Sequence, residues 1–161
     1  SGTLTLTGYT GNIIRWEATT DGGLSWPTSY AVNTNTFTFS NLTQTTTFRA
    51  VVQSGNCTVE YSNAITITVS PLTVPGILGN DATVCATANN GSLMLNGYNG
   101  TILNWEFSVN NGSSWSVISN TSNTLSYTNL TTTTQYRVSV QSGVCAPQYS
   151  NTASVTVVPP V

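Results

Sequence analysis

Few side chains in this chain of 161 residues could take part in catalysis or bind a metal ion. The absence of histidine excludes a Ser–His–Asp triad, a Cys–His pair and a histidine-based metal site. The acidic residues are scattered and too few for a set of calcium sites: Glu17, Asp21, Glu60, Asp81 and Glu106. We therefore expect no enzyme, no catalytic residue, no metal ion and no cofactor.

One polar motif occurs twice. The pattern T-x-D-x-G-x-S-W, which begins at Thr19 and contains Asp21, returns as S-x-N-x-G-x-S-W, which begins at Ser108 and contains Asn110. It resembles the Asp-box of sialidases, but sialidases bind the substrate carboxylate with several arginines and use a tyrosine nucleophile. This chain has three arginines in all, and its second copy replaces Asp with Asn. We therefore interpret the motif as a hairpin turn in which the Asp or Asn side chain accepts hydrogen bonds from turn amides.

Four aromatic residues near turns form the second candidate site. Tyr9 and Tyr98 stand in G-Y-x-G turns, and Trp26 and Trp115 end the repeated hairpin motif. Exposed rings of this kind can stack on sugars, which would make a carbohydrate-binding module. The alternative, which the presence of these residues in both repeats favours, is that the rings cap the domain or pack against a neighbouring one.

Charge and hydropathy exclude other classes of partner. Charged residues make up 5% of the chain and the net charge is −2, so no basic surface is available for nucleic acid or an anionic membrane. No apolar run is long enough to span a bilayer, so we expect no direct membrane insertion.

The chain consists of two copies of one repeat. GTLTLTGYTGNIIRWE at residues 2–17 returns as GSLMLNGYNGTILNWE at 91–106, and NLTQTTTFRAVVQSGNC at 41–57 returns as NLTTTTQYRVSVQSGVC at 129–145. The expected domains are residues 1–71 and 72–161, joined by a Pro-containing, semi-extended linker at about 70–76.

Alternation of apolar and polar residues predicts an all-β fold, with six or seven short strands in each repeat. The side chains expected to face inward are Ile14, Trp16, Ala18, Phe48, Ala50, Val52, Ile65, Ile67 and Val69, with Leu103, Trp105, Phe107, Tyr136, Val138, Val140, Ala153, Val155 and Val157 in the second repeat. Trp16 and Trp105 resemble the strand-C tryptophan of immunoglobulin-like sandwiches, and Tyr136 in L-x-x-x-T-x-Y resembles their tyrosine corner. We predict two tandem immunoglobulin/fibronectin-III-like β-sandwiches.

Strands C and F are neighbours in such a sandwich. Glu17 would then lie beside Arg49, and Glu106 beside Arg137, on the outward face. We expect an exposed ion pair in each domain, worth well under about 1 kcal/mol, in preference to a binding site built on the arginines.

The three cysteines fit the repeat only if the first copy is incomplete. Cys85 precedes the second repeat, and its counterpart would fall before Ser1, so we expect a Cys85–Cys145 disulfide and a partner for Cys57 upstream of Ser1. The alternative is three unpaired buried thiols. The first sandwich would accordingly lack its N-terminal strand, which leaves open that this strand comes from another molecule.

The combined pattern G-x-L-x-L-x-G-Y-x-G-x-I-x-x-W-E, D-G-G-x-S-W, R-x-x-V-Q-S-G-x-C and Y-S-N resembles the immunoglobulin-like tandem repeats of large secreted Bacteroidetes surface proteins, including adhesins of gliding motility. This resemblance implies export by the type IX pathway to the outer cell surface, attached at the outer membrane, with many copies in tandem. It carries over no catalytic residue.

We therefore expect a non-enzymatic stalk segment of a large repeat adhesin or surface fibre, which projects an adhesive region from the cell. Its partners would be neighbouring repeats of the same chain, with surface glycans or other stalk copies as further candidates. The alternative function is a carbohydrate-binding module that uses exposed aromatic residues.

Overall fold

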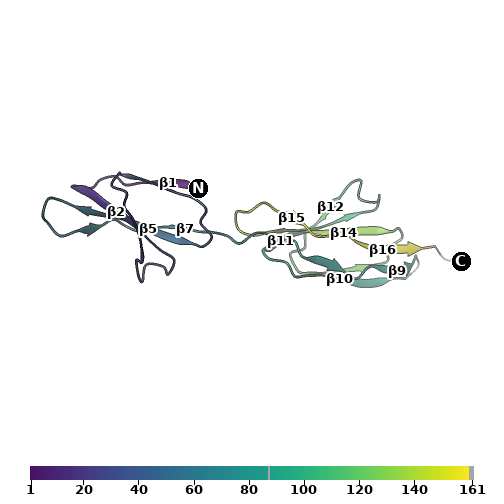
Figure 1. Ribbon diagram of the computed structural model, residues 1–161. Coiled ribbons are helices and arrows are strands. Elements are labelled where there is room, and N and C mark those ends of the chain that lie inside the picture. The colour runs from purple at the N-terminus through teal and green to yellow at the C-terminus, as the bar shows by residue number, and fades with distance from the viewer. Residues whose placement is uncertain (87, 160–161) are drawn as a thin grey trace. The chain divides into compact units, whose positions relative to one another are not determined.

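The computed structural model describes residues 1–86 and 88–159, and the chain divides into two compact units, Ser1–Ser70 and Pro71–Val161. Each unit is built from short strands that pair across long stretches of sequence (Figure 1). No helix in the described part of the chain is long and apolar enough to cross a membrane.

Unit 2 is a sandwich of two sheets. One sheet has the order β13-β10-β8, and the other has the order β12-β11-β14-β16-β9, with β15 paired to β14. Its strands are β8 (Ile77–Gly79), β9 (Ala82–Cys85), β10 (Asn90–Asn96), β11 (Thr101–Ser108), β12 (Ser116–Ile118), β13 (Thr124–Thr128), β14 (Thr134–Gln141), β15 (Gln148–Tyr149) and β16 (Ala153–Val158). The described pairs are antiparallel except for β9 and β16, which run parallel.

Unit 1 repeats this arrangement with fewer strands. A two-stranded sheet pairs β1 with β4, and a second sheet has the order β3-β2-β5-β6, with β7 paired to β5. Its strands are β1 (Gly2–Thr5), β2 (Asn12–Thr19), β3 (Thr28–Tyr30), β4 (Thr36–Phe39), β5 (Thr46–Gln53), β6 (Glu60–Tyr61) and β7 (Ile65–Ile67). Strands equivalent to β8 and β9 are absent from the described unit 1. Both units are immunoglobulin/fibronectin-III-type β-sandwiches, and the first lacks its N-terminal strand.

The cores form around the two predicted tryptophans. Trp16 and Trp105 are buried, and each indole N–H donates to a backbone carbonyl, of Thr34 at 3.1 Å and of Ser122 at 2.8 Å. Buried residues of the central strands pack around them, among them Phe48, Ala50, Val52, Tyr136, Val138 and Val140, as the alternation predicted. The indole hydrogen bonds fix the orientation of each ring in the core.

The inward positions predicted for Ile14 and Leu103 are wrong. Both side chains are exposed, and the buried residues are their neighbours Ile13 and Ile102. The cause is a register shift between Ile13 and Arg15, repeated between Ile102 and Asn104. A bulge inserts one extra residue, so strict alternation fails at that point and the preceding side chain turns inward.

The last strand of unit 1 also differs from expectation. In unit 2, Ala153 and Val155 of β16 are fully buried, but the corresponding Ile65 of β7 is 47% exposed and Ile67 is only partly buried. In unit 2 the parallel strand β9 lies along β16, and its Ala82 and Val84 pack on the core. The inward residues of β7 lack that cover.

The predicted Cys85–Cys145 disulfide is wrong. Cys85 is the last residue of β9 and pairs with Val158 of β16, three residues past the partner of Thr134 at the start of β14. Cys145 follows the other end of β14, which is Gln141. The two cysteines therefore lie at opposite ends of β14. The eight residues of β14 separate the two positions by about 25 Å, whereas a disulfide requires Cα atoms within about 7 Å. No disulfide joins the two residues, and Cys57 and Cys85 are exposed, so they are not buried thiols either.

The predicted linker is largely part of unit 2. The Thr73 hydroxyl donates to the Ala146 carbonyl at 3.0 Å and accepts from the Ser142 amide at 3.0 Å. Val74 forms a bridge with Asn99, whose carboxamide donates to the Leu72 carbonyl at 2.9 Å. Residues 72–74 are therefore held to the second sandwich, and they are not a free connection.

Leu78 on β8 is 2% exposed and belongs to the core of unit 2, whereas its neighbour Ile77 is 70% exposed. We predict that Leu78→Ala lowers the free energy of unfolding of unit 2 by about 2–5 kcal/mol, because it leaves a cavity, and does not change unit 1. Ile77→Ala should change it by less than about 0.5 kcal/mol. Urea unfolding followed by hydrogen-exchange mass spectrometry reports each unit separately. Equal effects of the two substitutions would contradict the placement of β8.

Candidate functional site

A charged cluster occupies the outer face of the central strand pair in each unit. In unit 1, Glu17 of β2 stands opposite Arg49 of β5, and Arg49 Nη2 lies 2.7 Å from Glu17 Oε2. In unit 2, Glu106 of β11 stands opposite Arg137 of β14, and Arg137 Nη2 lies 2.6 Å from Glu106 Oε2. Both predicted cross-strand pairs are therefore present.

Each arginine is also enclosed by two aromatic rings. The Arg49 guanidinium carbon lies 4.0 Å from the centre of the Trp26 ring and 3.8 Å from that of Tyr61. The Arg137 guanidinium carbon lies 4.1 Å from Trp115 and 4.0 Å from Tyr149. These distances are within the range of cation–π attraction. We name each set of carboxylate, arginine, Trp and Tyr an arginine stack.

The expectation of an exposed ion pair is wrong. Glu17 is 5% exposed and Glu106 is 8% exposed. The reason is that the Trp and Tyr rings cover the guanidinium, and the guanidinium in turn covers the carboxylate. Desolvation alone would raise the pKa of Glu17, but hydrogen bonds from Arg49 and Arg15 outweigh it and leave this pKa below its usual value.

The two stacks differ at one position. In unit 1, Arg15 is a second cation beside Glu17, with its Nη2 2.7 Å from Oε1. The corresponding residue in unit 2 is Asn104, whose Oδ1 is buried and has no hydrogen-bond partner among the described residues. Glu106 Oε1 instead accepts a hydrogen bond from the Tyr149 hydroxyl at 3.4 Å. Glu106 thus depends on a single arginine, whereas Glu17 has two.

The repeated hairpin motif is a turn, as its residues predicted. Asp21 accepts hydrogen bonds from the hydroxyls of Thr19 and Ser25 and from the Ser25 and Gly23 amides. Gly23 has a φ of 98°, which favours glycine. The hydrogen bonds from Ser25, and then that from the Thr19 hydroxyl, hold the pKa of the Asp21 carboxyl far below its usual range. The turn places Trp26 at the point where it meets Arg49.

Asn110 organises the same turn in unit 2. Its Oδ1 accepts from the Ser108 hydroxyl at 2.8 Å and from the Ser114 amide at 2.9 Å, and its Nδ2 donates to the Ser114 hydroxyl at 2.7 Å. An amide therefore replaces the carboxylate without loss of the hairpin, and Trp115 reaches Arg137 as Trp26 reaches Arg49.

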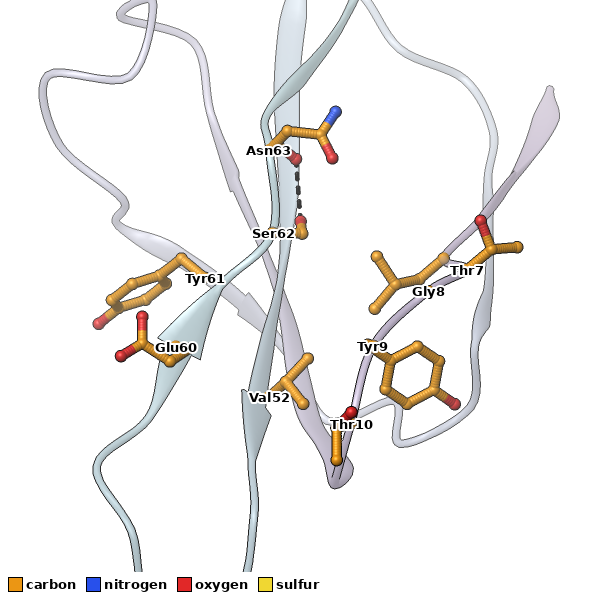
Figure 2. Close-up of a pocket in the computed structure, with 10 residues that line it drawn as sticks. Thr7, Gly8, Tyr9, Thr10, Val52, Glu60, Tyr61, Ser62 and Asn63 are labelled. Carbon is orange, nitrogen blue, oxygen red and sulfur yellow. Dashed lines mark hydrogen bonds between the residues drawn. The ribbon is translucent and has the colours of Figure 1, made fainter.

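The predicted tyrosines lie apart from the stacks. Tyr9 is 40% exposed and Tyr98 is 37% exposed, and the rings that lie over the two arginines are those of Trp26, Tyr61, Trp115 and Tyr149. Tyr98 packs closely on the chain that enters unit 2: a Cβ placed on Gly76 would lie 2.9 Å from Tyr98 Cβ. Tyr9 lines a cavity of about 310 Å³ in unit 1 (Figure 2). In unit 2 the tyrosine therefore packs against the chain that enters the domain, whereas in unit 1 the tyrosine faces a cavity.

Tyr136 is buried in the core of unit 2, and its counterpart in unit 1 is Phe48. Burial, the neighbouring Tyr127 and an opposing hydrogen bond with Thr134 together leave the pKa of Tyr136 above its usual value. The sequence did not predict that Tyr61, Tyr149 and Arg15 belong to the stacks. The repeated Y-S-N at 61–63 and 149–151 was the available signal for the two tyrosines. Within the described residues, no three His, Cys, Asp or Glu side chains gather to hold a metal ion.

The family model described as "Domain of unknown function (DUF8696)" matches residues 1–71 and 74–159, which correspond to the two repeats. No curated protein matches the chain. Among solved structures, the human OSCAR ligand-binding domain is similar at 12% identity and a TM-score of 0.38, over 89% of this chain and 84% of that one. The chicken CNTN1 FN1–FN3 domains are similar at 10% identity and a TM-score of 0.35, over 89% of this chain and 54% of that one.

The difference between the stacks predicts unequal effects of removing the arginine. Arg137→Met leaves Glu106 buried without a cation, and we expect it to destabilise unit 2 by about 3 kcal/mol. Arg49→Met leaves Glu17 paired with Arg15, and we expect a loss of about 1 kcal/mol in unit 1. Urea unfolding resolved by unit measures both. Adding Glu106→Gln to Arg137→Met should recover part of the loss, and equal losses in the two units would contradict this account.

The hairpins predict a difference in pH dependence. Because the folded pKa of Asp21 is depressed, its contribution is present above the unfolded pKa of about 3.9 and is lost as the pH falls below it. Asp21→Asn should therefore reduce the loss of unit 1 stability between about pH 4 and pH 2, and Glu17 accounts for a remaining part. The reciprocal Asn110→Asp should add such a dependence to unit 2. Unfolding curves at several pH values test both, and an unchanged slope in either variant would contradict the prediction.

Proposed function

Because the chain belongs to the DUF8696 family and carries that domain of unknown function twice, we propose that it is a non-enzymatic stalk segment of a large extracellular adhesin or surface fibre. In this role the domains bear tension between the cell and an adhesive region. Neighbouring repeats of the same chain are their partners.

The parallel pairing of β9 and β16 carries this proposal. The chain enters unit 2 ahead of β9 and leaves it after β16, and the two strands pair from Ala82–Val155 to Cys85–Val158. Once the contacts of residues 72–79 yield, tension on the two ends pulls these parallel strands in opposite directions along their own axes. The evenly spaced hydrogen bonds between them are then loaded together, in shear, and do not open one at a time. This geometry suits a domain that must stay folded under load.

Two further hydrogen bonds join the chain segments just beyond the two ends of the β9–β16 pairing. The Ala86 amide donates to the Val158 carbonyl at 3.1 Å, and the Ser154 amide donates to Asp81 Oδ1 at 2.8 Å. Both join the segment around β9 to the segment around β16, so they add to the bonds that resist separation.

The arginine stacks favour a stalk over a carbohydrate-binding module. One face of Trp26 lies against Arg49, and one face of Trp115 lies against Arg137. These rings were the candidate sugar platforms, and in both units they are engaged in holding the outer face of the sheet together. The absence of lysine and the low charge also suit a surface whose stability changes little with salt.

Single-molecule stretching of residues 1–161 tests the proposal. We expect two unfolding events that release about 25 nm for the 70 residues of unit 1 and about 32 nm for the 91 residues of unit 2. Unit 2 should unfold at the higher force, because β7 of unit 1 lacks a parallel partner.

A matched pair of variants isolates the sheared strands. The Val157 amide donates to Thr133 on the far side of β16, so the backbone N–H of its neighbour Thr156 faces β9. Thr156→Pro removes that donor and should lower the unfolding force of unit 2, whereas Thr156→Ala keeps it and should not. Equal forces for the two units, with no effect of Thr156→Pro, would contradict the stalk. Polysaccharide binding that is lost in Tyr9→Ala would instead favour the carbohydrate-binding alternative.

A further inference from the structure

We propose that unit 2 binds a guanidinium group in its arginine stack, beside Asn104 and Glu106. The group belongs to an arginine of another protein or to a small free ligand, and it takes the position that the Arg15 side chain fills in unit 1. This binding site goes beyond the stalk function. Its evidence is the comparison of two copies of one repeat at a position where both copies are fully described.

In unit 1 a guanidinium already occupies this position. The Arg15 Nε donates to Glu17 Oε1 at 2.8 Å, and the Arg15 Nη2 lies 2.7 Å from the same oxygen. Arg49 takes the other oxygen, Oε2, at 2.7 Å. The Glu17 carboxylate therefore holds two guanidinium groups, one on each oxygen. Because the Arg15 side chain is 34% exposed, the position that it fills is open to solvent.

In unit 2 the equivalent carboxylate holds one guanidinium. Arg137 takes Glu106 Oε2 at 2.6 Å, and the partner of Oε1 among the described residues is the Tyr149 hydroxyl at 3.4 Å. This distance is long for an O–H···O hydrogen bond, whose usual range ends near about 3.0 Å. One oxygen of Glu106 is therefore left with a weak partner at the place where Glu17 holds Arg15.

The residue at the Arg15 position adds a second acceptor. Asn104 pairs with Ser139, whereas Arg15 pairs with Val51, so unit 2 has two neutral polar side chains in place of a cation and an apolar one. The Asn104 Oδ1 is buried without a hydrogen-bond partner among the described residues, a state that a donor would relieve. The last torsion of an asparagine side chain is soft, so its rotation can turn this oxygen toward a ligand beside Glu106.

The chemistry of these acceptors selects the ligand. A guanidinium is planar and carries five N–H donors, so one group can donate to a carboxylate oxygen and to an amide oxygen at once. It can also lie over an aromatic ring, and the Tyr149 side chain is 47% exposed next to Glu106. Binding adds a positive charge to a neutral cluster of one carboxylate and one arginine. The resulting cluster has the same charge as the one in unit 1, where one carboxylate meets two arginines.

The ligand comes from outside these 161 residues, which include three arginines and no lysine. Arg15, Arg49 and Arg137 are each already paired with a glutamate. A second copy of the same residues would have to break one of these pairs in order to fill the site. The occupant is therefore a guanidinium of a different molecule.

NMR titration of the full chain with ethylguanidinium, below denaturing concentrations, tests the site. We expect saturable shifts of the Asn104 side-chain amide and of backbone amides in β11 and β15, without comparable shifts in β2 and β6. Ethylurea has nearly the same shape but no charge. It should bind at least about tenfold more weakly, because it forms no charge-assisted hydrogen bond with Glu106.

Two reciprocal substitutions provide matched controls. Asn104→Arg supplies the guanidinium from within the chain, as in unit 1, and should abolish the shifts in unit 2. Arg15→Asn removes it from unit 1, where Glu17 keeps Arg49, and should create a second site with shifts in β2 and β6. If Asn104→Arg does not fold, the presence or absence of this second site decides the question.

The proposal would be overturned by shifts that do not saturate, by equal affinities for ethylguanidinium and ethylurea, or by unchanged binding in a folded Asn104→Arg variant. A short peptide, acetyl-Gly-Arg-Gly-amide, separates the two sources of the group. Tighter binding than that of ethylguanidinium would assign the site to an arginine of a partner protein. Equal or weaker binding would assign it to a small free ligand.

Discussion

The structure depends on the antiparallel pairing of the two central strands, β2 with β5 and β11 with β14. This pairing places a tryptophan on the core face and a carboxylate on the outer face at adjacent positions, Trp105 and Glu106 in unit 2. A buried carboxylate is tolerable only beside a cation, here Arg137. The hairpin turn and β15 hold that cation in place through cation–π contacts from Trp115 and Tyr149. Elements far apart in the sequence therefore meet at one arginine.

The segment that precedes each repeat decides how completely its sandwich closes. In unit 2, residues 77–85 cover one edge of each sheet, and the inward residues of β16 are buried as a result. In unit 1 no described residue takes this place, and Ile65 is left half exposed. The difference does not come from the strands themselves, because the two copies have nearly the same pattern of inward residues. It comes from the edge, where main-chain groups and apolar side chains are left uncovered together.

Sequence patterns predicted the parts of this fold that local geometry controls. Alternation predicted the all-β class and most inward residues, and the neighbouring C and F strands of the expected sandwich predicted both Glu–Arg pairs. Alternation failed at Ile14 and Leu103, because a bulge depends on pairing with a distant strand and leaves little local trace. The Cys85–Cys145 pair failed because residue count says nothing of which end of a sandwich a residue occupies. The burial of Glu17 was missed because the rings that cover it come from separate elements.

The closure of the unit 2 sandwich and its resistance to tension have one structural origin. The segment that contributes Leu78 to the core continues directly into β9, the strand that pairs in parallel with β16. One short segment therefore completes the core and also supplies the hydrogen bonds that resist separation of the two ends of the unit.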